Sequence, residues 1–395
     1  MIYFLSPFWS GLEWGNVIRL LFADPPGEVP KVLEGELKRL TGASYALALN
    51  LGRSCIQVTL EAYNFPKGSE VILPSFSCSG VVTPVIQAGL TPVYADIDQD
   101  FNLVAESVRS LVSGRTCAII FPHLCGKFAK DTFEILSLAE KADIKTIEDA
   151  TQAFGLMYKN KWAGTFGDVG IFSFGNGKNM FGTGGGAIIT DDQEVALYCQ
   201  NLKLVEENPR IVRNRIFNYV FRYSLQSLSS PFLLLRILAL QLTKATPKKI
   251  SFADFKFSIY RISKAEALLA IQNIKNQKQI ISKRKSNAND LLQAKGFEKN
   301  KLQIPNPDNH VFTKFLTSTV SDRNHALLLR HKLRAQGIET ESSYLPLHIR
   351  KPFDIFSREP LPTTELLSPG AFSIPVRPNL TNKQMQRIVE ALNSL

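Results

Sequence analysis

Short apolar runs alternate with helical stretches across residues 46–190, and this alternation limits the fold more than any other feature of the sequence. The runs at residues 46–49, 71–73 and 117–120 are bounded by turn residues, which is typical of buried strands. Strands that are joined through helices pair in parallel, and the helices then cover the sheet. We therefore predict an α/β fold with a mainly parallel, helix-covered sheet.

A glycine-rich loop with a single lysine follows the strand predicted at residues 169–174. Lys178 lies among small residues and is followed by Gly184, Gly185 and Gly186, which let the backbone turn sharply and approach a flat ligand. A lone lysine in a shielded pocket suits an amine that condenses with a carbonyl, because burial lowers its pKa and the neutral amine is the nucleophile. A Walker-type phosphate loop is excluded, because no Lys-Ser or Lys-Thr pair follows the glycines. The alternative is a solvated surface lysine.

Two adjacent carboxylates end another predicted strand, which begins at Lys145. They are Glu148 and Asp149, and the amide of Gln152 follows in a turn. Open α/β sheets bind ligands at the carboxyl ends of their strands. An aspartate at this position would keep a pyridine nitrogen protonated and so make the ring an electron sink. The alternative is an aspartate that caps the start of a helix.

The two stretches together resemble the pyridoxal-phosphate enzymes of fold type I, specifically the nucleotide-sugar aminotransferases of the DegT/DnrJ/StrS type. The family pattern of Ser-Phe, three residues and Lys before a glycine-rich turn is matched by Ser173, Phe174 and Lys178. The family pattern Glu-Asp-Ala-x-Gln is matched from Glu148 to Gln152. The resemblance extends roughly from residue 28 to the end of the chain.

This resemblance implies the roles of four residues. It makes Lys178 the residue that holds pyridoxal 5′-phosphate through a Schiff base and shuttles protons, and Asp149 the partner of the pyridine nitrogen. It places Gln152 near the ring hydroxyl and Ser173 near the cofactor phosphate. Related sugar dehydratases carry histidine in place of this lysine, so Lys178 favours amino transfer. The implied reaction moves an amino group, from glutamate as donor, to a keto group of a nucleotide-linked sugar for cell-surface polysaccharide or glycoconjugate biosynthesis.

Two further turns supply the remaining cofactor-binding candidates, which are Gly52, Arg53, Ser54, Phe76 and Cys78. The first three open a helix, whose backbone amides suit a phosphate group, and the family has a Gly-Thr-Ala type of turn there. The second turn, in the family, lays an aromatic ring over the cofactor. Cys78 stands at the position of that aromatic residue, so we expect Phe76 or Cys78 itself to cover the cofactor.

The resemblance also implies how the chain is organised. An N-terminal segment at residues 1–27 precedes a large cofactor-binding domain at 28–250 and a smaller α+β domain at 251–395. Tyr344 and His348 match the family's closing segment, where substrate specificity is partly set, and are therefore the substrate-binding candidates. The family forms homodimers whose active sites borrow residues from both subunits.

The apolar insertion at residues 215–249 is the least familiar part of the chain. Between Tyr223 and Thr243 the only charge is Arg236, and cations flank the stretch. Pro231 and Arg236 argue against a membrane-spanning helix. An interfacial helix that dips into an anionic leaflet is one interpretation, and it predicts peripheral contact at the inner face of a membrane. A dimer-interface or substrate-covering helix pair is the other, and we favour it.

Composition narrows the partners and the compartment. The formal net charge is +11, but the basic residues are spread out and not clustered with stacking aromatics, which argues against a nucleic-acid partner. The five cysteines form no Cys-x-x-Cys pair, which indicates buried thiols in a reducing cytoplasm. The five histidines show no metal-ligand spacing, so we predict no metal. We expect the lone His123 to be structural rather than catalytic.

Two alternatives compete with an aminotransferase. A pyridoxal-phosphate-dependent sugar dehydratase or lyase would use the same lysine but release a ketone without consuming an amino donor. A non-catalytic, membrane-associated protein on the same scaffold is suggested by Cys78, by the apolar insertion and by Ile259, which replaces a family asparagine that reaches a cofactor phosphate across the dimer. Bound cofactor would separate this protein from the two enzymes.

Overall fold

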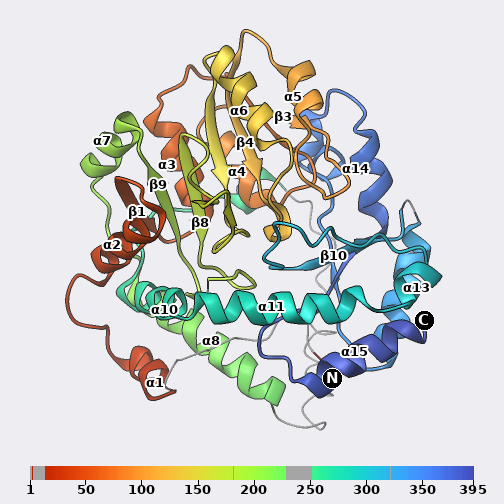
Figure 1. Ribbon diagram of the computed structural model, residues 1–395. Coiled ribbons are helices and arrows are strands. Elements are labelled where there is room, and N and C mark those ends of the chain that lie inside the picture. The colour runs from red at the N-terminus through yellow and green to blue at the C-terminus, as the bar shows by residue number, and fades with distance from the viewer. Residues whose placement is uncertain (1, 3–13, 181, 228–250, 321) are drawn as a thin grey trace.

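The computed structural model describes residues 2, 14–180, 182–227, 251–320 and 322–395. Figure 1 shows a large sheet with helices on both faces, and a second, smaller sheet beside it. The insertion predicted at residues 215–249 is described only as far as residue 227, so most of its apolar stretch lies outside the described residues.

Seven strands form the large sheet in the order β1-β9-β8-β5-β4-β2-β3. They are β1 (Tyr45–Leu49), β2 (Glu70–Pro74), β3 (Thr91–Ala95), β4 (Thr116–Pro122), β5 (Lys145–Asp149), β8 (Val169–Ser173) and β9 (Gly186–Thr190). Only β9 among these runs antiparallel to its neighbours, and all other pairs within the sheet are parallel. The mainly parallel sheet that the sequence predicts is therefore confirmed.

Alternation along each strand explains why helices cover both faces of this sheet. In β1, Leu47 and Leu49 face one helical layer, whereas Ala46 and Ala48 face the other. The first layer contains α3 (Gly52–Ala62), α4 (Ser79–Gln87) and α7 (Gln193–Asn201), and the second contains α2 (Val29–Thr41), α5 (Ala105–Leu111), α6 (Thr132–Lys141) and α10 (Lys264–Lys275). The sheet is thus buried on both sides.

The smaller sheet is antiparallel and has its own core. Its order is β10 (Phe315–Ser318), β12 (Ala371–Ile374) and β11 (Glu341–Ser342). The helices that share this core are α11 (Gln277–Leu292), α12 (Gly296–Lys299), α13 (Arg323–Ala335) and α15 (Asn382–Asn393). Ala270 of α10 still packs on the large sheet, whereas Ala288 of α11 joins the small-sheet core. The domain boundary at residue 251 remains a prediction.

The remaining elements are peripheral. They are α1 (Trp14–Phe22), α8 (Pro209–Ser227), α14 (Pro362–Leu367) and a hairpin of β6 (Met157–Tyr158) and β7 (Lys161–Trp162). Helices α1 and α8 pack together through Val17, Leu20, Val212 and Ile216 and lie against α10 (Figure 1). No helix in the described ranges is long and apolar enough to cross a membrane.

Candidate active site

The loop that carries Lys178 leaves the carboxyl end of β8. Phe174, fully buried, anchors the beginning of this loop. A Cβ atom at Gly184 would lie 2.4 Å from Glu266 Oε1, and Gly185 has a φ of +105°, which side-chain-bearing residues rarely adopt. Glycine is required at these two positions because the backbone there packs closely against other parts of the protein. The close approach of a ligand, which the sequence suggests, is not needed to explain them.

The amine of Lys178 is held in a part-buried position beside the end of β5. Its Nζ donates a hydrogen bond to Thr151 Oγ1 at 3.3 Å. Burial lowers the pKa of Lys178, the charge of Lys314 lowers it further, and the charges of Cys78 and Asp149 oppose this effect. The net lowering increases the neutral, nucleophilic fraction of the amine. A solvated surface lysine would not show this shift, so the structure favours the carbonyl-condensing amine.

Asp149 ends β5 and is only 6% exposed. Its Oδ1 accepts a hydrogen bond from the backbone N–H of Thr151 at 3.0 Å. Residues 150–156 form turns, and no helix begins there. The helix-capping interpretation of Asp149 is therefore wrong, because the carboxylate stabilises a turn that orients Thr151 toward Lys178.

Glu148 and His123 form a buried framework behind Asp149. His123 Nε2 lies 2.8 Å from Glu148 Oε1, and both side chains are fully buried. The N–H of Ala129 donates to His123 Nδ1 at 3.1 Å, so the ring proton belongs on Nε2 and is donated to the carboxylate. Backbone N–H groups within residues 164–167 also donate to Glu148. This network gives His123 the structural role that the sequence predicts.

Gln152 connects the turn after β5 to Tyr344, which follows β11. Its Oε1 accepts from the N–H of Cys125 at 3.2 Å, and its Nε2 donates to Tyr344 Oη at 3.3 Å. The ring of Tyr344 meets Phe76 edge-on, with 5.8 Å between centroids. Phe76 is fully buried, whereas Cys78 is partly exposed and close enough to Lys178 for its charge to act on that amine. Of the two candidates for covering the cofactor, Cys78 is therefore the more accessible.

The predicted phosphate turn lies next to the end of β8. A Cβ atom at Gly52, the first residue of α3, would lie 3.2 Å from Ser173 Cβ, so these two candidates are neighbours. Arg53 is partly exposed beside them. Ser54 is fully buried, and its hydroxyl donates to Asn50 Oδ1 at 2.9 Å. The Ser54 hydroxyl hydrogen is therefore engaged within the protein and is not offered to a phosphate.

The structure separates the two substrate-binding candidates. Tyr344 contacts Gln152 and so belongs to the same site as Lys178. His348 is buried, its Nδ1 lies 2.6 Å from Ser75 Oγ, and its Nε2 lies 3.5 Å from Glu365 Oε1. Burial lowers the pKa of His348. These contacts hold the closing segment against α14 and the residue that follows β2, and a substrate contact for His348 remains a prediction.

Thr151, Lys314 and Glu341 also lie at or beside this site, although the sequence does not predict them as site residues. Thr151 lies inside the recognised motif, where its hydroxyl could have been noticed. Lys314 and Glu341 form an ion pair, and Lys314 lies 5.6 Å from the ring centroid of Tyr344. No local pattern distinguishes this lysine from other lysines, because its neighbours come from distant parts of the chain. Across the described part of the chain, no group of three or more His, Cys, Asp or Glu side chains is arranged to hold a metal ion.

Comparison of the sequence with known proteins finds a family model and several relatives. A model of the DegT/DnrJ/EryC1/StrS aminotransferase family matches residues 22–393. A pleiotropic regulatory protein from Geobacillus stearothermophilus is 26% identical over 371 residues, which cover 93% of this chain and 89% of that protein. A UDP-N-acetyl-3-dehydro-alpha-D-glucosamine 3-aminotransferase from Acidithiobacillus ferrooxidans is 34% identical over 179 residues, which cover 45% of this chain and 48% of that enzyme.

Among solved structures, Helicobacter pylori PseC, an aminotransferase involved in the biosynthesis of pseudoaminic acid, superposes with a TM-score of 0.77. The match covers 99% of this chain and 98% of that chain at 20% identity. At this level of identity the likeness establishes the fold.

Proposed function

The chain belongs to the DegT/DnrJ/EryC1/StrS aminotransferase family, and from this premise we propose that it transfers an amino group from glutamate to a keto group of a nucleotide-linked sugar. Enzymes of this family depend on pyridoxal 5′-phosphate. The observation that carries the proposal is the amine of Lys178, which has a lowered pKa and lies beside the turn that follows Asp149.

Pyridoxal 5′-phosphate fits the residues around Lys178. Gly52 at the amino end of α3 and Ser173 are adjacent, which suits a phosphate held by backbone amides and a hydroxyl. Asp149 is a buried carboxylate that can hold a proton on a pyridine nitrogen, and Gln152, whose amide donates to Tyr344, follows in the same turn. When bound, the cofactor supplies an electron sink for a carbanion.

In the proposed reaction, the residues of the chain itself have separate roles. The Nζ of Lys178, whose pKa is lowered, would hold the cofactor and would move the proton between the carbon of the amino donor and the cofactor. Thr151 Oγ1 orients that Nζ by the 3.3 Å hydrogen bond. Asp149 would stabilise a proton on the pyridine nitrogen, and the Glu148–His123 framework keeps the end of β5 in place.

The proposal also includes the acceptor substrate and the biosynthetic role of its product. A nucleotide-linked keto sugar as the acceptor is supported by the Acidithiobacillus relative, which is named as a 3-aminotransferase of a UDP-linked dehydro sugar. Cell-surface polysaccharide or glycoconjugate biosynthesis is the setting in which such aminated sugars are used. A dehydratase is the less favoured alternative, because Lys178 stands where related dehydratases carry histidine.

We further propose that the protein is a cytoplasmic homodimer and that a second copy covers the exposed apolar side chains of α1 and α8. Phe22 is 76% exposed, and Phe217 and Phe221 are each about half exposed with their rings stacked at 6.0 Å. Sedimentation velocity of a Phe217→Ser, Phe221→Ser variant should show weaker dimerisation than the unchanged protein. An unchanged dimer combined with lost binding to anionic vesicles would instead favour the peripheral membrane contact.

An absorption spectrum of the purified holoenzyme, recorded before and after addition of glutamate, tests the proposed activity. The visible band of the lysine-bound cofactor should bleach to the pyridoxamine form. A band that persists with glutamate would mean another donor or a lyase. No band after reconstitution with pyridoxal 5′-phosphate would favour the non-catalytic scaffold.

A further inference from the structure

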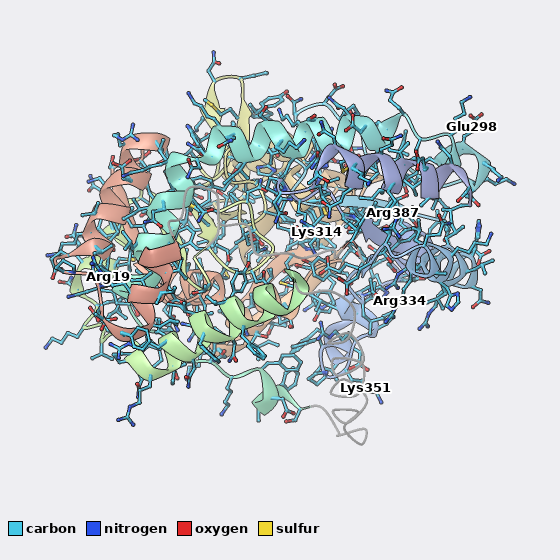
Figure 2. The ribbon with its side chains drawn as sticks, turned by 90° about the horizontal axis from the view of Figure 1, so that it is seen from below. Arg19, Glu298, Lys314, Arg334, Lys351 and Arg387 are labelled. Carbon is cyan, nitrogen blue, oxygen red and sulfur yellow. The ribbon has the colours of Figure 1, made fainter. Side chains whose placement is uncertain are left out.

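A second lysine, Lys314, lies beside the site of Lys178 and is not used in the mechanism above. It immediately precedes β10, forms an ion pair with Glu341 of β11, and lies over the ring of Tyr344 at 5.6 Å from the centroid. Figure 2 shows Lys314 well inside the outline of the molecule, whereas Arg19 and Lys351 lie toward its rim. The side chain of Lys314 is only 19% exposed, unlike that of a solvated surface lysine.

A continuous series of contacts joins the two lysines. Lys178 Nζ donates to Thr151 Oγ1, and the next residue, Gln152, donates to Tyr344 Oη at 3.3 Å. The ring of Tyr344 in turn lies against the ammonium of Lys314. The two amines therefore lie at the two ends of the series Thr151, Gln152 and Tyr344. Burial is the main cause of the lowered pKa of Lys178, and the charge of Lys314 lowers it further.

The ion pair is placed where a substrate group can exchange with it. The side chain of Lys314 is 19% exposed and that of Glu341 is 33% exposed, so neither is sealed in the core. An ammonium has three N–H donors and can be shared between carboxylates. The carboxylate of Glu341 therefore marks a position at which Lys314 stabilises a carboxylate.

We propose that Lys314 binds a carboxylate of the substrate, and that Glu341 holds Lys314 in place and competes with that carboxylate. The proposal rests on the proposed function, because an amino donor such as glutamate must bring its amino carbon to Lys178 while its carboxylates need cationic partners. An acidic sugar on the acceptor offers the same chemistry. Loss of Lys314 should weaken carboxylate binding, whereas neutralising Glu341 should strengthen it.

Isothermal titration of the holoenzyme with glutarate tests these opposite signs, because glutarate has two carboxylates and no amine to react. In Lys314→Met, the Kd for glutarate should rise by about tenfold or more, since a charged hydrogen bond is lost. In Glu341→Gln, the Kd should fall by up to about tenfold, since the competing charge is removed. Lys314→Arg should keep most of the affinity. Lys383→Met, at an exposed lysine of α15, is the control for a change of net charge.

The same titration with UDP-glucuronate and UDP-glucose identifies the source of the carboxylate. If Lys314→Met weakens only UDP-glucuronate among the three ligands, the carboxylate belongs to the acceptor sugar. The proposal is overturned if Lys314→Met binds glutarate and UDP-glucuronate like the unchanged enzyme, or if Glu341→Gln weakens binding as much as Lys314→Met does, which is the signature of a purely structural ion pair. Circular dichroism verifies that each variant is folded.

Failure of this proposal can be told apart from failure of the proposed function. If glutamate still bleaches the cofactor band of the unchanged enzyme while Lys314→Met and Glu341→Gln bind both glutarate and UDP-glucuronate normally, the aminotransferase activity stands and Lys314 has no carboxylate role. If glutamate does not bleach the band of the unchanged enzyme, the proposed donor is wrong, and the glutarate titration still reports on Lys314.

Discussion

Lys145 and Lys178 lie at opposite ends of the parallel strands, which we call the amino edge and the carboxyl edge of the sheet. Their pKa values are shifted in opposite directions. Lys145 begins β5, and although burial alone lowers its pKa, the hydrogen bond and charge of Asp192 raise it overall. Lys178 follows β8 at the other edge, where burial and the charge of Lys314 lower its pKa. The surroundings of Lys145 favour its charged form, whereas those of Lys178 favour the neutral form that the proposed chemistry needs.

The two edges also differ in how they use carboxylates. The amino edge contains a groove of about 630 Å³ that Asp168, Asp191 and Asp192 help to line. Each of these is committed to the fold, since Asp168 accepts from Thr146, Asp191 from Ser44, and Asp192 caps α7. The volume of a groove is therefore a poor guide to the reaction site. The perturbed amine and its neighbours identify the site more directly.

Replacing each lysine by alanine should give the largest difference in turnover between the two edges. Lys178→Ala removes the nucleophile and proton shuttle, so we expect transamination to be abolished and covalent attachment of the cofactor to be lost. Lys145→Ala should retain turnover within about twofold, because its amine contacts only structural groups. Steady-state rates and the visible absorption band measure both. Turnover at the original rate in Lys178→Ala would contradict the mechanism.

The two aspartates that end or support β5 offer a second contrast. Asp149→Asn should lower kcat by about 10²-fold or more, because the proton on the pyridine nitrogen is no longer stabilised. Asp168→Asn should leave kcat nearly unchanged but lower the free energy of unfolding by about 1–2 kcal/mol, because two hydrogen bonds from Thr146 weaken. Equal losses of kcat in the two variants would show that the loss in Asp149→Asn comes from disturbed folding.

The charge of Lys314 should affect the pH dependence of Lys178. Because a neighbouring positive charge disfavours the protonated amine, Lys314→Met should raise the pKa of Lys178. The pH at which pyridoxal 5′-phosphate attachment to the cofactor-free protein is half-maximal should therefore move upward. Rapid-mixing absorbance between pH 6 and pH 10 measures this, with Lys383→Met as the control. A downward shift would contradict the assigned electrostatics.

The smallest expected effect lies at the amino edge. Lys145→Met should reduce the free energy of unfolding by roughly 0–1 kcal/mol, because the pair with Asp192 is partly exposed and screened. Since the pKa of Lys145 is raised, its contribution is complete below the unfolded-state pKa and is lost as pH rises through the folded-state pKa. Since the pKa of Asp192 is lowered, its contribution is lost as pH falls through the folded-state value. Urea unfolding at several pH values tests both signs.

The sequence predicts the local features of this molecule well. The strand before Lys178, the strand that ends at Asp149 and the helix opening at Gly52 all carry short apolar runs or turn residues that act within a few positions. Because these strands run parallel, their carboxyl ends had to meet at one edge, and the neighbourhood of Lys178 and Asp149 followed.

Most of the contacts that the sequence could not predict join distant segments, and the hydrogen bond of Ser54 is the local exception. Ser54 looks like a phosphate ligand until Asn50, one turn earlier, takes its hydroxyl hydrogen. Tyr344 reaches Gln152 across 192 residues, and Lys314 meets Glu341 only because β11 and β10 flank β12. No local pattern records such packing. The same limit explains why His348, beside Tyr344 in the chain, lies instead against Ser75.

The difference between the two lysines can be measured directly. Trace acetylation of the cofactor-free protein across a range of pH, followed by mass spectrometry of the peptides that contain Lys145 and Lys178, reports the fraction of each amine that is neutral. We predict that Lys178 becomes half-reactive below the ordinary lysine value of 10.5 and Lys145 above it. Coincident titration curves, or Lys178 titrating above Lys145, would contradict the claim that this edge of the sheet is built to hold a neutral amine.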